Sequence, residues 1–351
     1  MCRQWGRTRG DSRGRSDPRS RGFRRWSLAV AAQICFLSLF RSAAQAQPVI
    51  HVDVNLVRLV ATVKTPAGEL VGALRKEDFQ IADNGAPQEI SVFERQTDQP
   101  LSVALMVDTS GSTAKDLKFE TDSAARFLRA LLSEGNPNDV VSLYTFNWEV
   151  RQNREFTHSL TSLTSSLKLL HGEAGTSLYD AIYLASRDLE DREGRKVMVI
   201  VTDGGDTTSA KNLKQALAAA HYADAVIYPV VVIPITNDAG RNIGGENALK
   251  FMADGTGGRT FLPSLGAELD RAFSDIIDEL RTQYVLGFYP RNVPLAKDPF
   301  HTLDVHVKRP ELRVSARNGY YGEAEGPGTP DAHISTTPQP RTSQAKKKQE
   351  K

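Results

Sequence analysis

The sequence predicts a doubly wound α/β domain with a mainly parallel sheet, inserted in or flanked by a small β-sandwich-like domain. Two observations predict this fold class. Apolar runs without polar alternation recur in the middle of the chain, as expected of strands that helices cover on both faces. Stretches of helical length separate these runs, and regular alternation of strand and helix is typical of a doubly wound sheet. The apolar runs are Val103–Val107, Val140–Phe146, Val197–Val201 and Val226–Ile233.

The stretches between the runs place apolar residues three and four positions apart, which predicts helices with one buried side. These candidate helices are Asp116–Leu132, Leu178–Leu189, Ala210–Ala220, Gly245–Ala253 and Leu265–Leu280. Together with the strands they predict one α/β domain over residues 99–282, an ordinary size for a domain.

Residues on either side of this region alternate between apolar and polar, as half-buried strands do. The first β segment, residues 47–98, contains the strand candidates Val52–Val63, Phe79–Ile81 and Ile90–Phe93. The second β segment, residues 283–322, contains Tyr284–Tyr289, Thr302–Val307 and Leu312–Ala316. Neither segment is long enough to bury a core alone, so we expect the two to pair in one small β domain.

The first 46 residues have the pattern of an export signal. Nine arginines precede the apolar run Trp26–Phe40, and Ala44-Gln45-Ala46 supplies a small-x-small cleavage pattern. We expect cleavage after Ala46 and a periplasmic or secreted bacterial protein. The general secretory route fits, and Arg24-Arg25 also permits the twin-arginine route. An uncleaved leader is the alternative, and it is the one feature that predicts attachment to a membrane.

Cleavage would change both the charge and the cysteine content. The remaining chain has 34 basic and 40 acidic residues, so the basic balance of the whole sequence does not predict a nucleic-acid partner. Cys2 and Cys35 both lie in the leader, which leaves no disulfide, zinc ribbon or thiol nucleophile. Residues 323–351 are rich in Pro, Ser, Thr, Gln and Lys and predict a disordered tail.

Polar residues with oxygen donors directly follow the first buried strand. Asp108, Ser110 and Ser112 are each two positions apart, so their oxygens can face one point at the carboxyl edge of the sheet, where such folds bind ligands. Hard divalent cations prefer oxygen ligands of this kind. Asp and Ser are also common at helix N-termini, so these three residues alone equally suit a helix cap.

Two further elements favour the metal site. Thr176 stands in Gly175-Thr176-Ser177-Leu178-Tyr179-Asp180-Ala181, and Asp203 follows the buried run in Thr202-Asp203-Gly204. The three motifs together resemble the metal-ion-dependent adhesion site of von Willebrand factor A domains, which have a Rossmann-like fold. The flanking β segments, which end in Asn318-Gly319-Tyr320-Tyr321, resemble the VWFA-related proteins described from acidobacteria. This resemblance covers nearly all of residues 48–322.

The resemblance implies a role for each residue of the site. Ser110, Ser112 and Thr176 would approach a cation directly or through water, and Asp108 and Asp203 would hold it largely through bound water. Mg²⁺ is the expected ion, with Mn²⁺ or Ca²⁺ as alternatives. A cation with few anionic ligands stays electrophilic, so the resemblance implies that a carboxylate of a protein partner completes its coordination.

Two nearby carboxylates are expected to have structural roles. Asp206 suits the N-cap of the helix that begins near Ser209. Asp180 is expected to support the Thr176 loop.

No enzyme class fits the motifs. Asp108-Thr109-Ser110-Gly111 superficially resembles an aspartic protease, but such enzymes need two Asp-Thr/Ser-Gly elements and Asp203 is followed directly by Gly204. A Gly-x-Ser-x-Gly elbow is also absent from the sequence. We therefore expect a non-enzymatic binding protein without a small-molecule substrate. The alternative is a structural component of the cell envelope in which the cation only stabilises the domain.

Overall fold

The computed structural model describes residues 56–95, 99–232, 242–294 and 299–322. The expected export signal over residues 1–46 lies outside the described residues, as do the tail over residues 323–351, the start of the first strand candidate and Ile233. Among the residues described, no helix is both long and apolar enough to cross a membrane.

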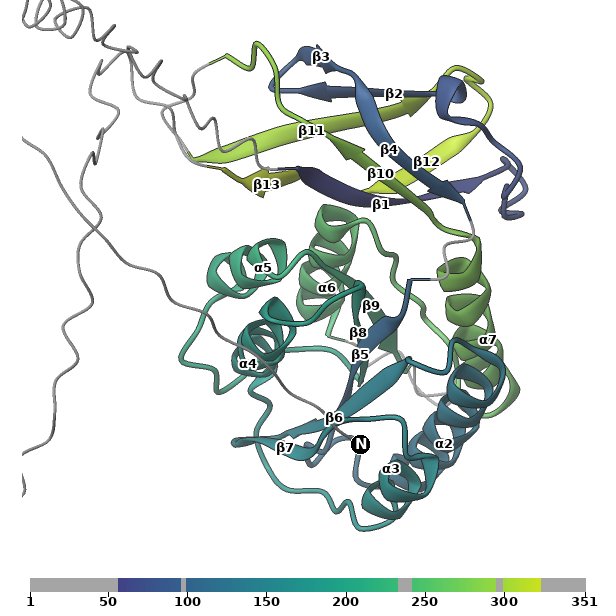
Figure 1. Ribbon diagram of the computed structural model, residues 1–351. Helices are drawn as coiled ribbons and strands as arrows, with labels where there is room; N and C mark the ends of the chain where they lie inside the picture. Colours follow the sequence, from purple (N-terminus) through teal and green to yellow (C-terminus); the bar gives the residue numbers. More distant parts are fainter. Residues whose placement is uncertain (1–55, 96–98, 233–241, 295–298, 323–351) are drawn as a thin grey trace, which may run out of the picture. The chain divides into compact units, whose positions relative to one another are not determined.

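A five-stranded sheet forms the centre of the α/β domain, in the order β7-β6-β5-β8-β9 (Figure 1). Four strands are parallel and almost wholly buried, as their unbroken apolar sequences predict. The fifth, β7, runs antiparallel to β6 at the edge of the sheet. The strands are β5 (Leu101–Asp108), β6 (Val140–Phe146), β7 (Val150–Thr157), β8 (Arg195–Thr202) and β9 (Ala225–Val231). The predicted mainly parallel sheet is confirmed.

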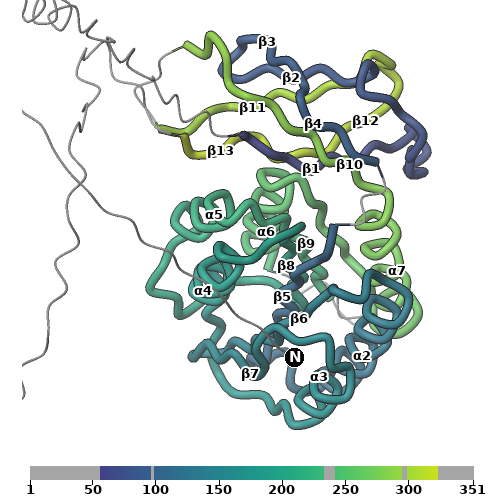
Figure 2. The backbone as a smooth tube through the Cα atoms, viewed as in Figure 1, coloured from purple at the N-terminus to yellow at the C-terminus, as the bar shows by residue number. Residues whose placement is uncertain are grey.

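Helices cover both faces of this sheet (Figures 1 and 2). One face packs against α2 (Leu117–Glu134), α3 (Leu160–Leu167) and α7 (Ala267–Thr282). The other face packs against α4 (Leu178–Glu190), α5 (Leu213–Tyr222) and α6 (Ile243–Thr256).

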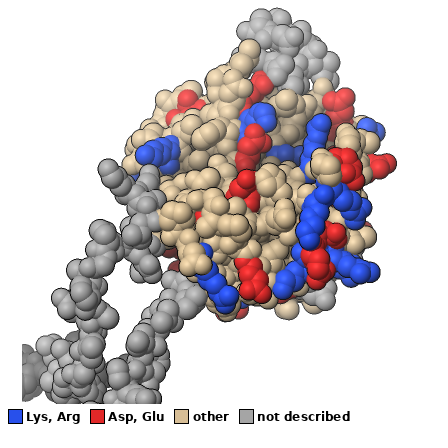
Figure 3. Space-filling model, turned by 90° about the horizontal axis from the view of Figure 1, so that it is seen from above, with Lys and Arg blue, Asp and Glu red and all other residues tan. Residues whose placement is uncertain are grey.

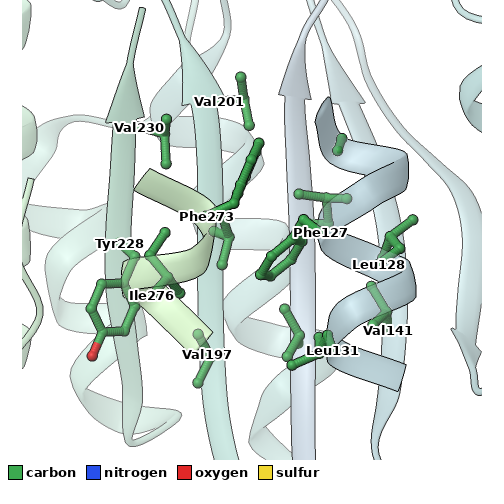
Figure 4. Close-up of a cluster of buried hydrophobic side chains, with 14 of the residues drawn as sticks. Phe127, Leu128, Leu131, Val141, Val197, Val201, Tyr228, Val230, Phe273 and Ile276 are labelled. Atoms are coloured by element: carbon green, nitrogen blue, oxygen red, sulfur yellow. The ribbon is translucent and has the colours of Figure 1, made fainter. Parts of the chain in front are cut away.

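Successive side chains of each strand alternate between the two faces. On the first face, the rings of Phe127 from α2 and Phe273 from α7 stack with centroids 4.9 Å apart (Figure 4). Such pairs stabilise a core beyond the area that they bury. Two apolar layers therefore hold the strands from both sides.

Two elements of this domain are missing from the sequence-based prediction. Strand β7 consists mainly of exposed or half-buried polar residues, and helix α3 has only eight residues, five of them Ser or Thr, so neither has the apolar run or the long periodic stripe that predicts a buried element. Helix α5 begins at Leu213, three residues later than predicted, because Asn212 and Gln215 form a capping box at its start. The prediction that Asp206 caps this helix is therefore wrong.

The two β segments pair with each other in two four-stranded sheets. In the first sheet, β1 lies between β10 and β12, so a strand from before the α/β domain is bonded to strands from after it. In the second sheet, β11 pairs in the same way with β2. This confirms the expected pairing around an inserted domain. The strands are β1 (Val57–Lys64), β2 (Phe79–Asp83), β3 (Ala86–Gln88), β4 (Ile90–Arg95), β10 (Tyr284–Phe288), β11 (Phe300–Val307), β12 (Arg313–Ala316) and β13 (Gly319–Tyr321), with the short helix η1 (Lys76–Asp78) before β2.

Side chains join the β domain to the α/β domain. Lys64 of β1 forms an ion pair with the buried carboxylate of Glu279 in α7, with 2.5 Å between Nζ and Oε1. The ring of Tyr222 at the end of α5 stacks on Tyr321 of β13, with centroids 4.4 Å apart. Because these contacts combine charge and ring packing, we expect the two domains to unfold together.

His221 adds a titratable group to this junction. Its imidazole is buried and packs edge-on against the Phe300 ring, with centroids 5.3 Å apart. Burial lowers the pKa of His221 to about 4, and the charge of Arg317 contributes to the shift. The folded protein therefore binds this proton less readily than the unfolded chain does.

We predict that acid destabilises the fold through His221. The unfolded imidazole gains its proton below its ordinary pKa of 6.5, and the folded one only near pH 4, so stability falls as the pH drops through this window. In urea denaturation, the difference in free energy of unfolding between wild type and His221→Gln should shift by roughly 2 kcal/mol between pH 7 and pH 5, in favour of the variant.

His306→Gln is the matched control, because the His306 side chain is 67% exposed in the same β domain. This variant should follow the wild-type pH profile. A His221→Gln profile parallel to wild type would contradict the assignment.

Candidate functional site

Asp108, the last residue of β5, is the most deeply buried acidic group at the carboxyl edge of the sheet, with no exposed surface. Its Oδ2 accepts a hydrogen bond of 2.6 Å from the Thr202 hydroxyl, and its Oδ1 accepts one of 2.8 Å from the Ser110 amide. Burial raises the pKa of Asp108 to about 6, although both hydrogen bonds favour the charged form and oppose the rise. The carboxylate is thus held in one orientation, and no Lys or Arg of the residues that the structure describes forms an ion pair with it.

The loop after Asp108 brings two hydroxyl groups together. Ser110 Oγ and Ser112 Oγ are 3.1 Å apart, so the two predicted serine ligands face the same point. Thr113 Oγ1 donates to the carbonyl oxygens of Asp108 (3.1 Å) and Ser110 (3.0 Å), which closes the loop on itself. Helix α2 starts four residues later with no side-chain cap from Asp116. The helix-cap interpretation of Asp108, Ser110 and Ser112 is therefore not supported.

Asp203 comes from the neighbouring strand. Strands β5 and β8 are parallel and in register from Leu101 to Val107, so Asp203 follows β8 at the same edge of the sheet at which Asp108 ends β5. The Thr202 hydroxyl that donates to Asp108 also accepts from the Gly204 amide at 3.1 Å. The bond between Thr202 and Asp108 joins the ends of β8 and β5. The negative charge of Asp203 lies close enough to raise the pKa of Asp108.

Thr176 is buried in a loop that contacts both the loop after Asp108 and the segment after Asp203. The amide of Glu173 donates to the Thr109 carbonyl (2.8 Å), and the amide of Thr207 donates to the Thr176 carbonyl (2.8 Å). Thr207 Oγ1 in turn accepts from the Thr176 amide at 2.9 Å. The three segments that carry the five predicted residues are thus connected directly by hydrogen bonds.

Asp180 and Asp206 connect this loop to the segment after Asp203. Asp180 accepts from the amides of Ala210 and Lys211, and Asp206 accepts from the amide of Tyr179 at the start of α4. Asp180 therefore fixes residues 210 and 211 against the start of α4. Asp206 accepts a backbone hydrogen bond at the N-terminus of α4.

Gly175 permits a close contact within the Thr176 loop. Its φ is +85°, and a Cβ atom at this position would lie 2.9 Å from the Cβ atom of Trp148. The Trp148 amide also donates to the Ala174 carbonyl at 3.2 Å. The glycine therefore lets the β6–β7 turn pack against the loop that carries Thr176.

Glu120 is an acidic residue of this region that the motifs did not identify. It lies in the first turn of α2 and is 1% exposed. Burial raises its pKa to about 8, and the charges of Asp108 and Asp203 add to the rise. The signal in the sequence is a glutamate on the apolar side of a helix directly after the Asp108 loop.

The donor set fits a hard divalent cation. Three neutral hydroxyls and two carboxyl groups are available from Ser110, Ser112, Thr176, Asp108 and Asp203, and the unpaired buried carboxyl of Glu120 is a further acidic group that a cation would help to ionise. Within the described ranges, no group of three or more His, Cys, Asp or Glu side chains could hold a metal ion. A cation here would consequently depend on hydroxyl oxygens and water, as Mg²⁺ accepts.

A separate cavity of about 510 Å³ lies at the opposite edge of the same sheet. It is lined by Leu101 and Arg195, the first residues of β5 and β8, and by the ends of α2 and α7. Strand β5 has eight residues, and at about 3.3 Å per residue the cavity is more than 20 Å from Asp108. It is therefore not part of the candidate site.

We predict that Gly175→Ala destabilises the protein more than Gly68→Ala. Both glycines have a φ near +86°, but nothing lies within 4 Å of a Cβ atom at Gly68. The left-handed backbone alone should cost each variant about 1–2 kcal/mol. Crowding against Trp148 should add to this in Gly175→Ala only, as urea denaturation would measure. Equal losses in the two variants would contradict the close packing of the loop.

Comparisons with known proteins give a family for this region. The model of the von Willebrand factor type A domain matches residues 102–264. No curated protein matches the chain.

Several solved structures are similar to part of the chain. The vWF domain of the type V pili tip protein Mfa5 from Porphyromonas gingivalis is 15% identical with a TM-score of 0.44, over 51% of this chain and 94% of that one. The conserved hypothetical protein BatB from Bacteroides thetaiotaomicron is 22% identical with a TM-score of 0.42, over 51% and 98%. The PilB minor pilin from Streptococcus sanguinis is 15% identical with a TM-score of 0.41, over 53% and 62%.

The family match begins one residue into β5 and ends just before α7, so it includes all five predicted site residues. Within these bounds the parallel sheet has helices on both faces, as the sequence motifs imply. Residues 102–264 therefore form a von Willebrand factor type A domain, carried by this chain between two β segments.

Proposed function

We propose that this protein is an exported, non-enzymatic binding protein that uses a divalent cation to engage a carboxylate of a protein partner. The observation that carries the proposal is the Asp108 carboxylate, which is fully buried and oriented by Thr202 and Ser110 next to a pair of hydroxyls. Asp108, Ser110, Ser112, Thr176 and Asp203 would hold the cation, which is Mg²⁺ first and Mn²⁺ or Ca²⁺ otherwise.

The chemistry of these donors favours recognition over simple storage of the ion. Hydroxyl oxygens carry no formal charge, so a bound cation keeps much of its own charge for a further ligand. Ser112 is exposed and Asp203 is half-buried, so this part of the site faces solvent. A carboxylate from a partner could reach it, and a charge-assisted contact would be stronger than a neutral one.

An exposed aromatic side chain beside the site supports a protein partner. Trp148 is 59% exposed, and its indole N–H donates to Glu173 Oε2 at 2.9 Å, which holds the ring in place. Trp148 also packs against the loop of Thr176 through Gly175. Oriented tryptophans at the surface are common at the energetic centres of protein interfaces. The proposed docking surface is therefore the cation together with the Trp148 indole.

One face of the molecule lacks the charge distribution that a nucleic-acid partner needs. On the face shown in Figure 3, Lys and Arg side chains are interspersed with Asp and Glu side chains. Nucleic-acid binding depends on a continuous basic surface that neutralises several phosphates. The mixed charges on this face do not supply such a surface.

The alternative function, a structural component of the cell envelope, is favoured by the buried carboxyl groups themselves. Asp108 and Glu120 are both buried, and a cation near them would stabilise the folded domain without any partner. The two functions differ in one respect, which is whether removal of the cation releases a bound protein.

We predict that the purified protein binds Mg²⁺ and Mn²⁺, and that Asp108→Ala abolishes this binding in isothermal titration calorimetry. The substitution removes the buried carboxylate that the whole loop is built around. Asp122→Ala is the matched control, because Asp122 is exposed on α2. This variant should bind the cation with the affinity of wild type. Equal cation binding by wild type and Asp108→Ala would show that the site is wrongly assigned.

We predict that Trp148→Ala reduces capture of the partner at least tenfold and leaves the Mg²⁺ affinity unchanged, because interface tryptophans often contribute 2 kcal/mol or more. The measurement is a crosslinking pull-down from the envelope fraction, with and without chelator. Phe119→Ala, which removes another exposed aromatic side chain, is the control. A captured protein that the chelator and Trp148→Ala both leave in place would favour the structural alternative.

A further inference from the structure

Glu120 is a buried carboxyl group without a hydrogen-bond or ion-pair partner among the described residues. It is 1% exposed, and neither Oε1 nor Oε2 has a hydrogen-bond partner among the described residues. Buried polar groups are nearly always paired in native proteins, and an unpaired buried carboxyl costs stability. A glutamate in this place therefore needs a reason other than the stability of the cation-free fold.

The charges around Glu120 increase this cost. Those that act on it are the carboxylates of Asp108, Asp203 and Asp116, all of the same sign. The described part of the chain places no Lys or Arg in an ion pair with it. By contrast, Glu279, which is also buried, has both Lys64 and Arg259 as partners. The fold thus supplies basic partners to Glu279 but, among the described residues, none to Glu120.

Position in the fold relates Glu120 to the cation site. The helix that carries it begins at Leu117, directly after the loop of Ser110 and Ser112. Glu120 lies on the buried side of this helix together with Leu117, Ser123 and Ala124, which faces the sheet. Two of the three charges that act on it, Asp108 and Asp203, belong to the candidate site. The unpaired carboxyl therefore adjoins the place where the five other residues would hold a cation.

We propose that Glu120 is a sixth residue of the cation site, a positioning residue whose buried carboxylate supplies negative charge to a divalent cation held by Asp108, Asp203 and the hydroxyl groups. This inference rests on the proposed function and adds a residue that the five-residue motif does not contain. Glu120 does not form a ligand cluster with the two aspartates, so it acts from outside the direct ligands. Outer carboxylates of this kind strengthen metal binding by orienting ligands and bound water.

This placement has a consequence for recognition. A carboxylate that acts from the buried side adds attraction for the cation without occupying the exposed side, where Ser112 lies. The cation can then be retained more tightly while a partner carboxylate still has access to it. Glu120 would thus raise the affinity for the cation without blocking access of the partner carboxylate to it.

The test is isothermal titration calorimetry of Mg²⁺ and Mn²⁺ with the full chain. Glu120→Gln keeps the shape of the side chain and removes its charge, so the dissociation constant should rise about tenfold or more, the usual range for an outer-shell partner. Glu134→Gln is the matched control. It makes the same change at the other end of α2, where the side chain is 69% exposed, and should bind as wild type does.

A second variant separates charge from shape. Glu120→Asp keeps the carboxylate on a shorter side chain, so it should bind the cation more tightly than Glu120→Gln. A role in packing alone predicts the reverse order, because Gln has the shape of Glu and Asp does not. Thermal unfolding in EDTA is a further readout: removal of the unpaired buried carboxyl should leave the unfolding temperature of Glu120→Gln equal to or above that of wild type.

Three outcomes would overturn the inference. Wild-type affinity in Glu120→Gln would show that the charge does not act on the cation. Weaker binding by Glu120→Asp than by Glu120→Gln, or a lower unfolding temperature of Glu120→Gln in EDTA, would show a packing role. If one of these outcomes occurs while wild type binds the cation and Asp108→Ala does not, only the role of Glu120 is refuted and the five-residue site stands. If wild type binds no cation, the proposed function fails with it.

Discussion

The hydrogen bond from the Thr202 hydroxyl to the Asp108 carboxylate joins the ends of two neighbouring parallel strands, 94 residues apart in the chain. It fixes the orientation of Asp108 and, through the Gly204 amide on the same hydroxyl, the path of the backbone that carries Asp203. The bond depends on the register of β5 and β8, which the two apolar layers of the core hold in place. Packing far from the surface thus determines where polar groups meet at the edge of the sheet.

The loops at that edge are held by one another. The Asp108 loop accepts a backbone bond from the Thr176 loop, which in turn accepts one from the segment after Asp203. Gly175 and Trp148 add a close packing contact to this arrangement. Loops that are fixed in this way lose little entropy when a ligand binds, which favours a preformed site. The same contacts expose the Trp148 ring in a defined orientation beside the site.

The electrostatics of the site are unbalanced in one direction. Asp108 and Glu120 are buried and Asp203 lies nearby, so the region concentrates acidic groups where water is excluded, and the pKa values of Asp108 and Glu120 rise as a result. Such an arrangement opposes folding unless positive charge offsets it, and natural proteins retain this kind of strain mainly at functional sites. The buried carboxylate of Glu279, by contrast, has Lys64 and Arg259 as basic partners.

The class of the fold and the motif residues can be read from the amino-acid sequence alone. Unbroken apolar runs predict strands covered on both faces, and β5, β6, β8 and β9 have this form because the core selects for it. Edge strand β7 could not be predicted, because its polar residues carry no burial pattern. Three features became clear only from the folded structure. These are the order of the strands in the two β sheets, the hydrogen bond of Asp206 with the first turn of α4, and the burial of Glu120 without a hydrogen-bond partner among the described residues. The physical reason is that a sequence pattern records which side of an element is apolar. The groups that face each other across elements depend on long-range packing, which no local pattern contains.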